Sequence, residues 1–144
     1  MIEEDTVKLL RECDAGVKMG VSSIDDVLPQ VHSPSLQKYL TDCKAEHRKL
    51  EHTIRLELDR CGDTGKAPNP VAKGMSWMMT NVKLALDDSD EKIADLMTDG
   101  CNMGVKSLNR YLNEYKAADE VSKDIAKRLI HLEERLAEDI RGFL

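Results

Sequence analysis

The chain has 144 residues, a net charge of −6 and only 3% aromatic side chains. That length suits one domain with its own core, and the scarcity of aromatic residues argues against a β-rich fold. The acidic balance provides no basic stripe for nucleic acid, and the sequence has no apolar window of about 18 residues to span a membrane. We therefore expect a single domain over residues 1–144 whose partners include neither nucleic acid nor membrane.

The first predicted helix runs from about Glu3 to Leu28. Gly16 and Gly20 lie one turn apart beside its apolar stripe. Since Gly weakens a helix by about 1 kcal/mol relative to Ala, this pair predicts the close approach of a neighbouring helix. The stripe itself recurs at intervals of three and four, the spacing of a helix with one face in a core. It consists of Val7, Leu10, Cys13, Val17, Val21 and Ile24, joined late by Leu28.

The second predicted helix covers Ser35 to Cys61, after a break at residues 29–34 that contains two prolines. Ser33 and Pro34 suit its first turn, and Gly62 suits its end. Because the break is short, we expect this helix to be the antiparallel neighbour of the first. Its apolar stripe is Leu36, Leu40, Cys43, His47, Leu50, Ile54, Leu58 and Cys61.

Residues 62–70 carry two Gly and two Pro and are predicted to form a loop. The apolar run from Val71 to Leu86 predicts a short extra helix, which would carry the chain from one end of a bundle to the other. Two more long helices are expected, from about Asp90 to Lys116 and from about Glu120 to Phe143. The stripe predicted for the last helix is Val121, Ile125, Leu129, Leu132, Leu136, Ile140 and Phe143.

A weak internal repeat supports two similar helical hairpins. The run Cys13-Asp-Ala-Gly-Val-Lys18 resembles Cys101-Asn-Met-Gly-Val-Lys106, and each lies near the middle of the first helix of a hairpin. Two hairpins joined by a long crossover predict an all-α, antiparallel four-helix bundle of ferritin-like connectivity. The short extra helix would lie in the crossover between the second and third long helices.

The order of these elements resembles that of a known family. The Trp-bearing run Gly74-Met-Ser-Trp-Met-Met79 in the crossover and the Cys-x-x-Gly motif in the third long helix carry the likeness. Together with the helix order, they resemble an uncharacterised bacterial ferritin-like family, a domain of unknown function. The resemblance covers nearly the whole chain and implies a ferritin-like four-helix bundle, but it implies no activity, substrate or catalytic residue.

A carboxylate di-iron centre requires a Glu from each of two helices and Glu-x-x-His from each of the other two. Neither His47 nor His131 has a Glu three residues before it. Cys13 and Cys101 stand where the other two helices would offer a Glu. At 100° per residue, His131 also points away from its helix's apolar stripe and toward water. The chain therefore lacks a complete di-iron ligand set.

A thiolate–imidazole site is the other metal centre that these residues could build. Cys13, Cys43, His47 and Cys101 all fall on inward stripes, and such ligands suit zinc. Glu51, one turn after His47, would then support the imidazole from outside the ligand set. The alternative is a core of buried thiols with a hydrogen-bonded imidazole, whose pKa would fall below about 6.5 if burial dominates.

Two functions follow from these patterns. The first is a non-catalytic bundle that acts through assembly or partner contacts, as a homo-oligomer such as a dimer or with a protein partner. The second is a metal-binding or redox-associated protein with zinc or iron at the core Cys/His site. The acidic opening MIEEDTVKLL is unlike a signal peptide, and thiols on core stripes fit a reducing compartment, so we expect a cytoplasmic protein.

Overall fold

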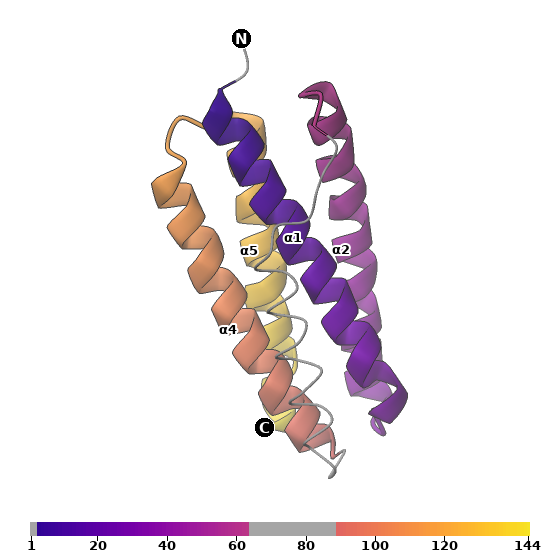
Figure 1. Ribbon diagram of the computed structural model, residues 1–144. Helices are drawn as coiled ribbons and strands as arrows, with labels where there is room; N and C mark the ends of the chain where they lie inside the picture. The colour runs from indigo at the N-terminus through magenta and orange to yellow at the C-terminus, as the bar shows by residue number, and fades with distance from the viewer. Residues whose placement is uncertain (1–2, 64–88) are drawn as a thin grey trace.

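The computed structural model describes residues 3–63 and 89–144, and within them every regular element is helical (Figure 1). Four long helices pack against one another, which confirms the predicted all-α bundle. The predicted extra helix at Val71–Leu86 lies outside the described residues. The helices are α1 (Glu4–Val27), α2 (Pro34–Arg60), α4 (Asp90–Glu114) and α5 (Glu120–Asp139), with short 3-10 turns at Leu28–Gln30 and Arg141–Phe143.

Three of the four long helices begin at a side chain that caps the helix N-terminus. Ser33 accepts a hydrogen bond from the Leu36 amide at the start of α2, and Ser89 caps α4 in the same way. Asp119 accepts from the Ser122 amide at 2.8 Å and caps α5. These caps satisfy backbone N–H groups that a first helical turn leaves without a partner, so they fix where the helices start.

Hydrogen bonds at both ends of the bundle fix the directions of its helices. At one end, the backbone amide of Asp119 donates to the Thr6 hydroxyl at 2.8 Å, so the α4–α5 connection meets the start of α1. At the other end, the amides of His32 and Ser33 donate to Asp90 at 2.8 Å, so the α1–α2 turn meets the start of α4. Consequently α1 and α5 run in one direction and α2 and α4 in the other (Figure 1).

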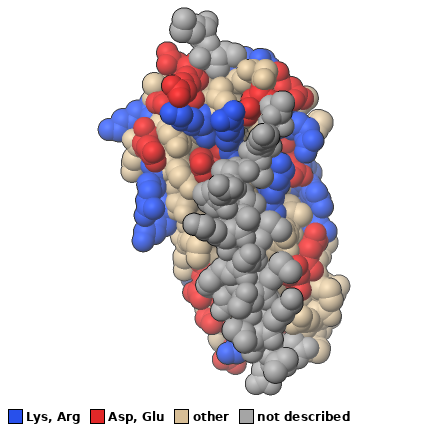
Figure 2. Space-filling view, in the orientation of Figure 1, with Lys and Arg blue, Asp and Glu red and all other residues tan. Residues whose placement is uncertain are grey.

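The chain after α2 also contacts α1 where α2 ends. Arg11 donates from Nε and Nη2 to the two carboxylate oxygens of Asp63 at 2.8 and 2.7 Å. Most other ion pairs on the surface join residues three or four apart along one helix, such as Lys38 with Asp42, whereas Lys44 pairs with Asp25 and so joins α2 to α1. Figure 2 shows acidic and basic side chains next to one another on the visible face. Such exposed pairs contribute little to stability, typically about 0–1 kcal/mol each.

The described part of the core forms two apolar clusters, one toward each end of the bundle. The first contains Cys13 and Leu50, and the second contains Cys43 and Cys101. All seven positions of the predicted α2 stripe from Leu36 to Leu58 are buried, as expected, whereas Cys61 is half-buried. Among the described residues, no helix combines the length and apolarity needed to cross a bilayer.

The inward face of α5 agrees with the predicted stripe at Ile125, Leu129, Leu136 and Ile140, which are all buried, and departs from it at Val121 and Leu132. Val121 is 48% exposed and Leu132 is only partly buried, although both belong to the predicted stripe. The buried face also includes three neighbouring positions that the predicted stripe leaves out, Ser122, Ala126 and Ile130. Ser122 can be buried at the start of this face because its hydroxyl donates to the Asp119 carboxylate in the helix cap.

Candidate functional site

A buried imidazole–carboxylate pair lies inside the bundle. His47 on α2 is 1% exposed, and its Nε2 lies 2.8 Å from Oε1 of Glu133 on α5. Its Nδ1 lies 2.8 Å from the backbone carbonyl oxygen of Cys43. A carbonyl and an ionised carboxylate can only accept hydrogen bonds, so both ring nitrogens must donate. The geometry therefore fits a positively charged imidazolium beside a carboxylate.

The surroundings of His47 raise its pKa rather than lower it. Burial alone would lower the pKa, because it disfavours the charged form. The contacts with Cys43 and the hydrogen bond and negative charge of Glu133 outweigh burial and raise the pKa of His47 from 6.5 to about 10. The expectation of a lowered pKa is therefore wrong, because it assumed an imidazole without an anionic partner inside the core.

Cys101 on α4 lies against the same carboxylate. Burial comes first among the causes that raise the pKa of its thiol far above the usual range, and the charge and hydrogen bond of Glu133 add to it. The thiol therefore stays protonated at neutral pH. The Glu133 side chain is 13% exposed. Glu133 thus joins α4 to α2 through one carboxylate that accepts from both a thiol and an imidazolium.

Glycines on the neighbouring helices leave room for this cluster. A Cβ atom at Gly20 on α1 would lie 2.9 Å from Cδ2 and Nε2 of the His47 ring, closer than real Cβ contacts. A Cβ atom at Gly104 on α4 would lie 3.6 Å from Oε2 of Glu133. The close helix approach predicted from the α1 glycines is therefore confirmed at Gly20, where α1 passes directly over the imidazole of α2.

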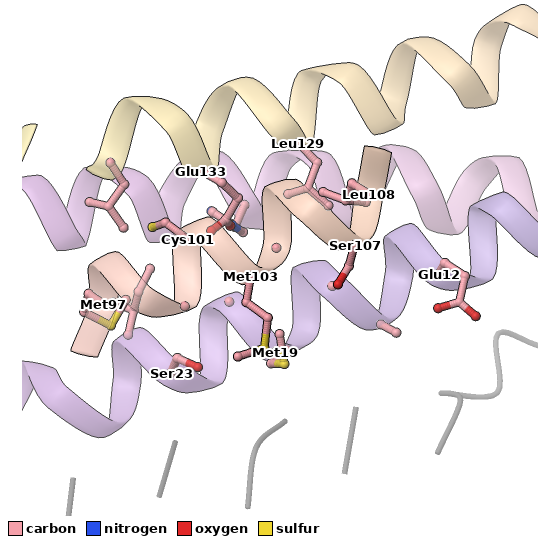
Figure 3. Close-up of a pocket in the computed structure, with 18 of the residues that line it drawn as sticks. Glu12, Met19, Ser23, Met97, Cys101, Met103, Ser107, Leu108, Leu129 and Glu133 are labelled. Carbon is pink, nitrogen blue, oxygen red and sulfur yellow. The ribbon is translucent and has the colours of Figure 1, made fainter. Parts of the chain in front are cut away.

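The cluster forms part of the lining of a groove of about 440 Å³ between α1 and α4 (Figure 3). Figure 3 shows Glu133 and Leu129 reaching into it from α5, with Met19 and Ser23 on the α1 side. Most of the wall is apolar or glycine. The described residues that line it are Glu12, Ala15, Gly16, Met19, Gly20, Ser23, Ile24, His47, Met97, Gly100, Cys101, Met103, Gly104, Ser107, Leu108, Tyr111, Leu129, Glu133 and Leu136.

The structure brings together three of the four residues predicted to bind a metal. Cys43 and Cys101 share one apolar cluster, and His47 contacts the first of them, with its Nδ1 3.5 Å from the Cys43 sulfur. Cys13 lies in the other apolar cluster, where burial raises the pKa of its thiol to about 12. Glu51, predicted to support the imidazole, has an ion pair with Arg48 at 3.4 Å, while Glu133 occupies the supporting position beside His47.

Among the described residues, the possible metal ligands around His47 are not arranged as a metal centre. Within residues 3–63 and 89–144, no group of three or more His, Cys, Asp or Glu side chains is arranged so that it could hold a metal ion. Each ring nitrogen of His47 is also engaged with a hydrogen-bond acceptor. A metal would need one of these nitrogens deprotonated and free, since only neutral imidazole coordinates.

Glu133 is a site residue that the sequence did not predict, because it is a charged residue outside the apolar stripe expected for the last helix. A signal is nevertheless present in the spacing of α5. Counting from Ser122 in steps of four and three reaches Ala126, Leu129, Glu133, Leu136 and Ile140. Glu133 is the charged member of that series, and an acid on a core stripe opposite a His on another stripe would have indicated the pair.

Comparisons of the chain with models of known protein families, with curated proteins and with solved structures find no match.

Proposed function

We propose that this protein is a cytoplasmic, ferritin-like helical bundle that acts by non-covalent binding, and that it binds a small apolar molecule in the groove between α1 and α4. The observation that carries the proposal is the groove itself, whose lining is mostly apolar and includes the Glu133 carboxylate. Its volume of about 440 Å³ falls within the range of about 300–1,000 Å³ that is typical of small-molecule sites. A few convergent polar groups in an apolar cavity are a general mark of such sites.

The chemistry of the polar groups supports binding over catalysis. The thiols of Cys13 and Cys101 have raised pKa values, and a protonated thiol is a poor nucleophile. His47 has both ring nitrogens in hydrogen bonds, and its pKa of about 10 keeps it protonated, so it is not a general base at neutral pH. Glu133 is left as a hydrogen-bond acceptor that faces the groove.

The helix directions support the ferritin-like part of the proposal. Because α2 and α4 run the same way, the chain must return from the end of α2 to the opposite end of the bundle before α4 begins. One long crossover between two antiparallel hairpins is the connectivity of ferritin-like folds. A homo-oligomer or protein partner, which the sequence leaves open, stays a prediction.

A metal-binding role is the second candidate, because Cys43, His47 and Cys101 come together in one half of the bundle. Elemental analysis of protein purified without chelator tests it. Stoichiometric zinc or iron that disappears in a His47→Ala variant would favour this candidate over apolar binding. Protein without metal, and with a melting midpoint unchanged by added chelator, would favour the groove as the binding site.

Cyclohexane is a suitable probe for the groove, because it is apolar and carries no hydrogen-bonding group. We expect it to shift the methyl NMR signals of Met19, Met97 and Met103, which line the groove, in protein labelled with carbon-13 at methionine methyl groups. Ser107→Leu places a larger side chain in the groove and should weaken these shifts. Lys106→Leu adds the same side chain to α4 outside the groove lining and should leave them unchanged. Absence of shifts at all three methyl groups in the parent protein would refute the proposed binding site.

A further inference from the structure

The groove's polar groups define which end group a bound molecule should carry. We infer that the groove selects an apolar molecule that bears a neutral hydrogen-bond donor, such as the hydroxyl of an alcohol or phenol, and that Glu133 accepts this hydrogen bond. The inference rests on the binding function proposed above and adds the chemical class of the ligand. It follows from which hydrogen-bonding positions are already used and from the charges that face the groove.

Glu133 has accepting capacity left on the groove side. Its Oε1 accepts from His47 at 2.8 Å, and the Cys101 thiol also contacts the carboxylate. Two carboxylate oxygens offer about four acceptor positions, so two of these bonds leave the carboxylate unsaturated. Gly104 lines the groove beside Oε2 and has no side chain, so it leaves room next to the carboxylate for a ligand group.

An anionic end group has no counter-charge in this site. The charged side chains among the described lining residues are Glu12, His47 and Glu133. His47 is the cation of the three, and both of its N–H groups are engaged, one with Glu133 and one with the Cys43 carbonyl. A ligand carboxylate would therefore be buried next to the Glu133 carboxylate without a free cation in the described lining to balance its charge, and neutral hydroxyls such as that of Ser107 supply no such charge. The site should reject carboxylates.

A cationic end group is disfavoured for the opposite reason. The imidazolium of His47 already balances the charge of Glu133, so an ammonium group would add an unbalanced positive charge to a largely buried pair. A hydroxyl adds no charge and can donate to a carboxylate in the stronger, charge-assisted kind of hydrogen bond. Glu12 does not change this ranking, because it lies eight residues before Gly20 on α1, about 12 Å along the helix from the His47 ring.

Four probes with the same six-carbon ring test the inference: cyclohexane, cyclohexanol, cyclohexylamine and cyclohexanecarboxylate. Their affinities are measured at neutral pH from the methyl signals of Met19, Met97 and Met103. We expect cyclohexanol to bind at least about tenfold more tightly than the carboxylate and the amine, since one good hydrogen bond to a charged group corresponds to about a tenfold change. Methoxycyclohexane, which keeps the oxygen but cannot donate, should also bind about tenfold more weakly than cyclohexanol.

Two matched variants identify the acceptor. Glu133→Gln replaces the carboxylate by an amide that can donate, so the preference for cyclohexanol over the carboxylate should fall below about threefold, while cyclohexane still binds. Glu12→Gln removes the other carboxylate of the lining and should keep the preference. If Glu133→Gln does not fold, the comparison of cyclohexanol with its methyl ether in the parent protein decides the question.

The outcomes separate the inference from the function on which it rests. Failure of every probe, cyclohexane included, would overturn the proposed binding groove. Binding of cyclohexane with equal affinities for cyclohexanol, its methyl ether and the carboxylate would overturn the inferred donor while leaving the groove intact. An amine that binds as tightly as the alcohol would overturn the charge argument. Loss of the preference in Glu12→Gln rather than Glu133→Gln would show that the acceptor is wrongly assigned.

Discussion

Replacing Gly20 by Ala is the sharpest test of how closely α1 packs on the buried pair. The added methyl carbon would lie 2.9 Å from both Cδ2 and Nε2 of the His47 ring. The ring cannot turn aside freely, because its two nitrogens are held at 2.8 Å by Glu133 and by the Cys43 carbonyl. Either the helices must separate or one of these hydrogen bonds must lengthen.

The expected size of the effect follows from two opposing contributions. Ala is favoured over Gly in a helix by about 1 kcal/mol, which would stabilise the variant. Overpacking in a close-packed core costs about 1–3 kcal/mol, and loosening a hydrogen bond to a charged group costs about another 1.5–3 kcal/mol when it is lost. We therefore expect Gly20→Ala to lower the free energy of unfolding by about 1–3 kcal/mol.

Gly16→Ala is the matched control, one turn earlier on the same helix. There the new methyl carbon would meet Leu129 Cδ2 at 3.5 Å, an ordinary van der Waals distance. The helix preference should then dominate and stabilise the protein by about 0.5–1 kcal/mol. Urea unfolding of both variants measures the difference. Equal stabilities for Gly20→Ala and Gly16→Ala would refute the argument that the imidazole is held rigidly against α1.

Three further predictions concern pH, the α5 face and the thiols. The folded pKa of His47 is raised from 6.5 to about 10, so its contribution to the stability of the fold is complete below about pH 6.5 and is lost as the pH rises toward 10. Urea melts should show this loss of stability, on the order of 2–5 kcal/mol. Glu133→Gln should abolish most of the loss. Leu129→Ala should destabilise the protein by about 2–5 kcal/mol and Val121→Ala by less than about 0.5 kcal/mol, since Leu129 is 1% and Val121 48% exposed. Equal losses of stability in the two variants would mean that Val121 is buried, as the predicted stripe has it. A thiol reagent should label half-buried Cys61 several-fold faster than the three buried thiols in the native protein, and uniform labelling rates would contradict their burial.

The sequence predicts the helices well because local signals define them. Ser33 and Pro34 start α2 as expected, and the strict three-and-four spacing through Leu50 is buried as predicted. The inward position of His47 and the outward position of His131, whose side chain is 79% exposed, are both confirmed. These features depend on the geometry of one helix at a time, and periodicity reports that geometry directly.

The candidate site is predicted less completely, because it depends on contacts between helices distant in sequence. Glu133 is 86 residues from His47, and its signal in the sequence is limited to its place in the three-and-four spacing of α5. Hydropathy alone does not select Glu133 as a core residue, since an isolated acid is rarely buried, but an acid paired with an imidazolium is an exception. The same omission reversed the direction expected for the pKa of His47. The groove was not predicted, because glycines mark close approach without showing what they approach.

The placement of the His47–Glu133 pair between two apolar clusters has a consequence for how uniquely the helices align. Leucines along α2 and α5 could interdigitate almost equally well after a slide of one turn, about 5.4 Å. Such a slide would bring Leu129 or Ala137 opposite the imidazolium and leave two buried charges without partners, which costs about 3–5 kcal/mol. The pair therefore favours one register of α5 against α2 over the alternatives. We expect a double variant, His47→Leu with Glu133→Leu, to stay stable in urea but to show broadened or doubled NMR signals along α5, as the two alignments become closer in energy.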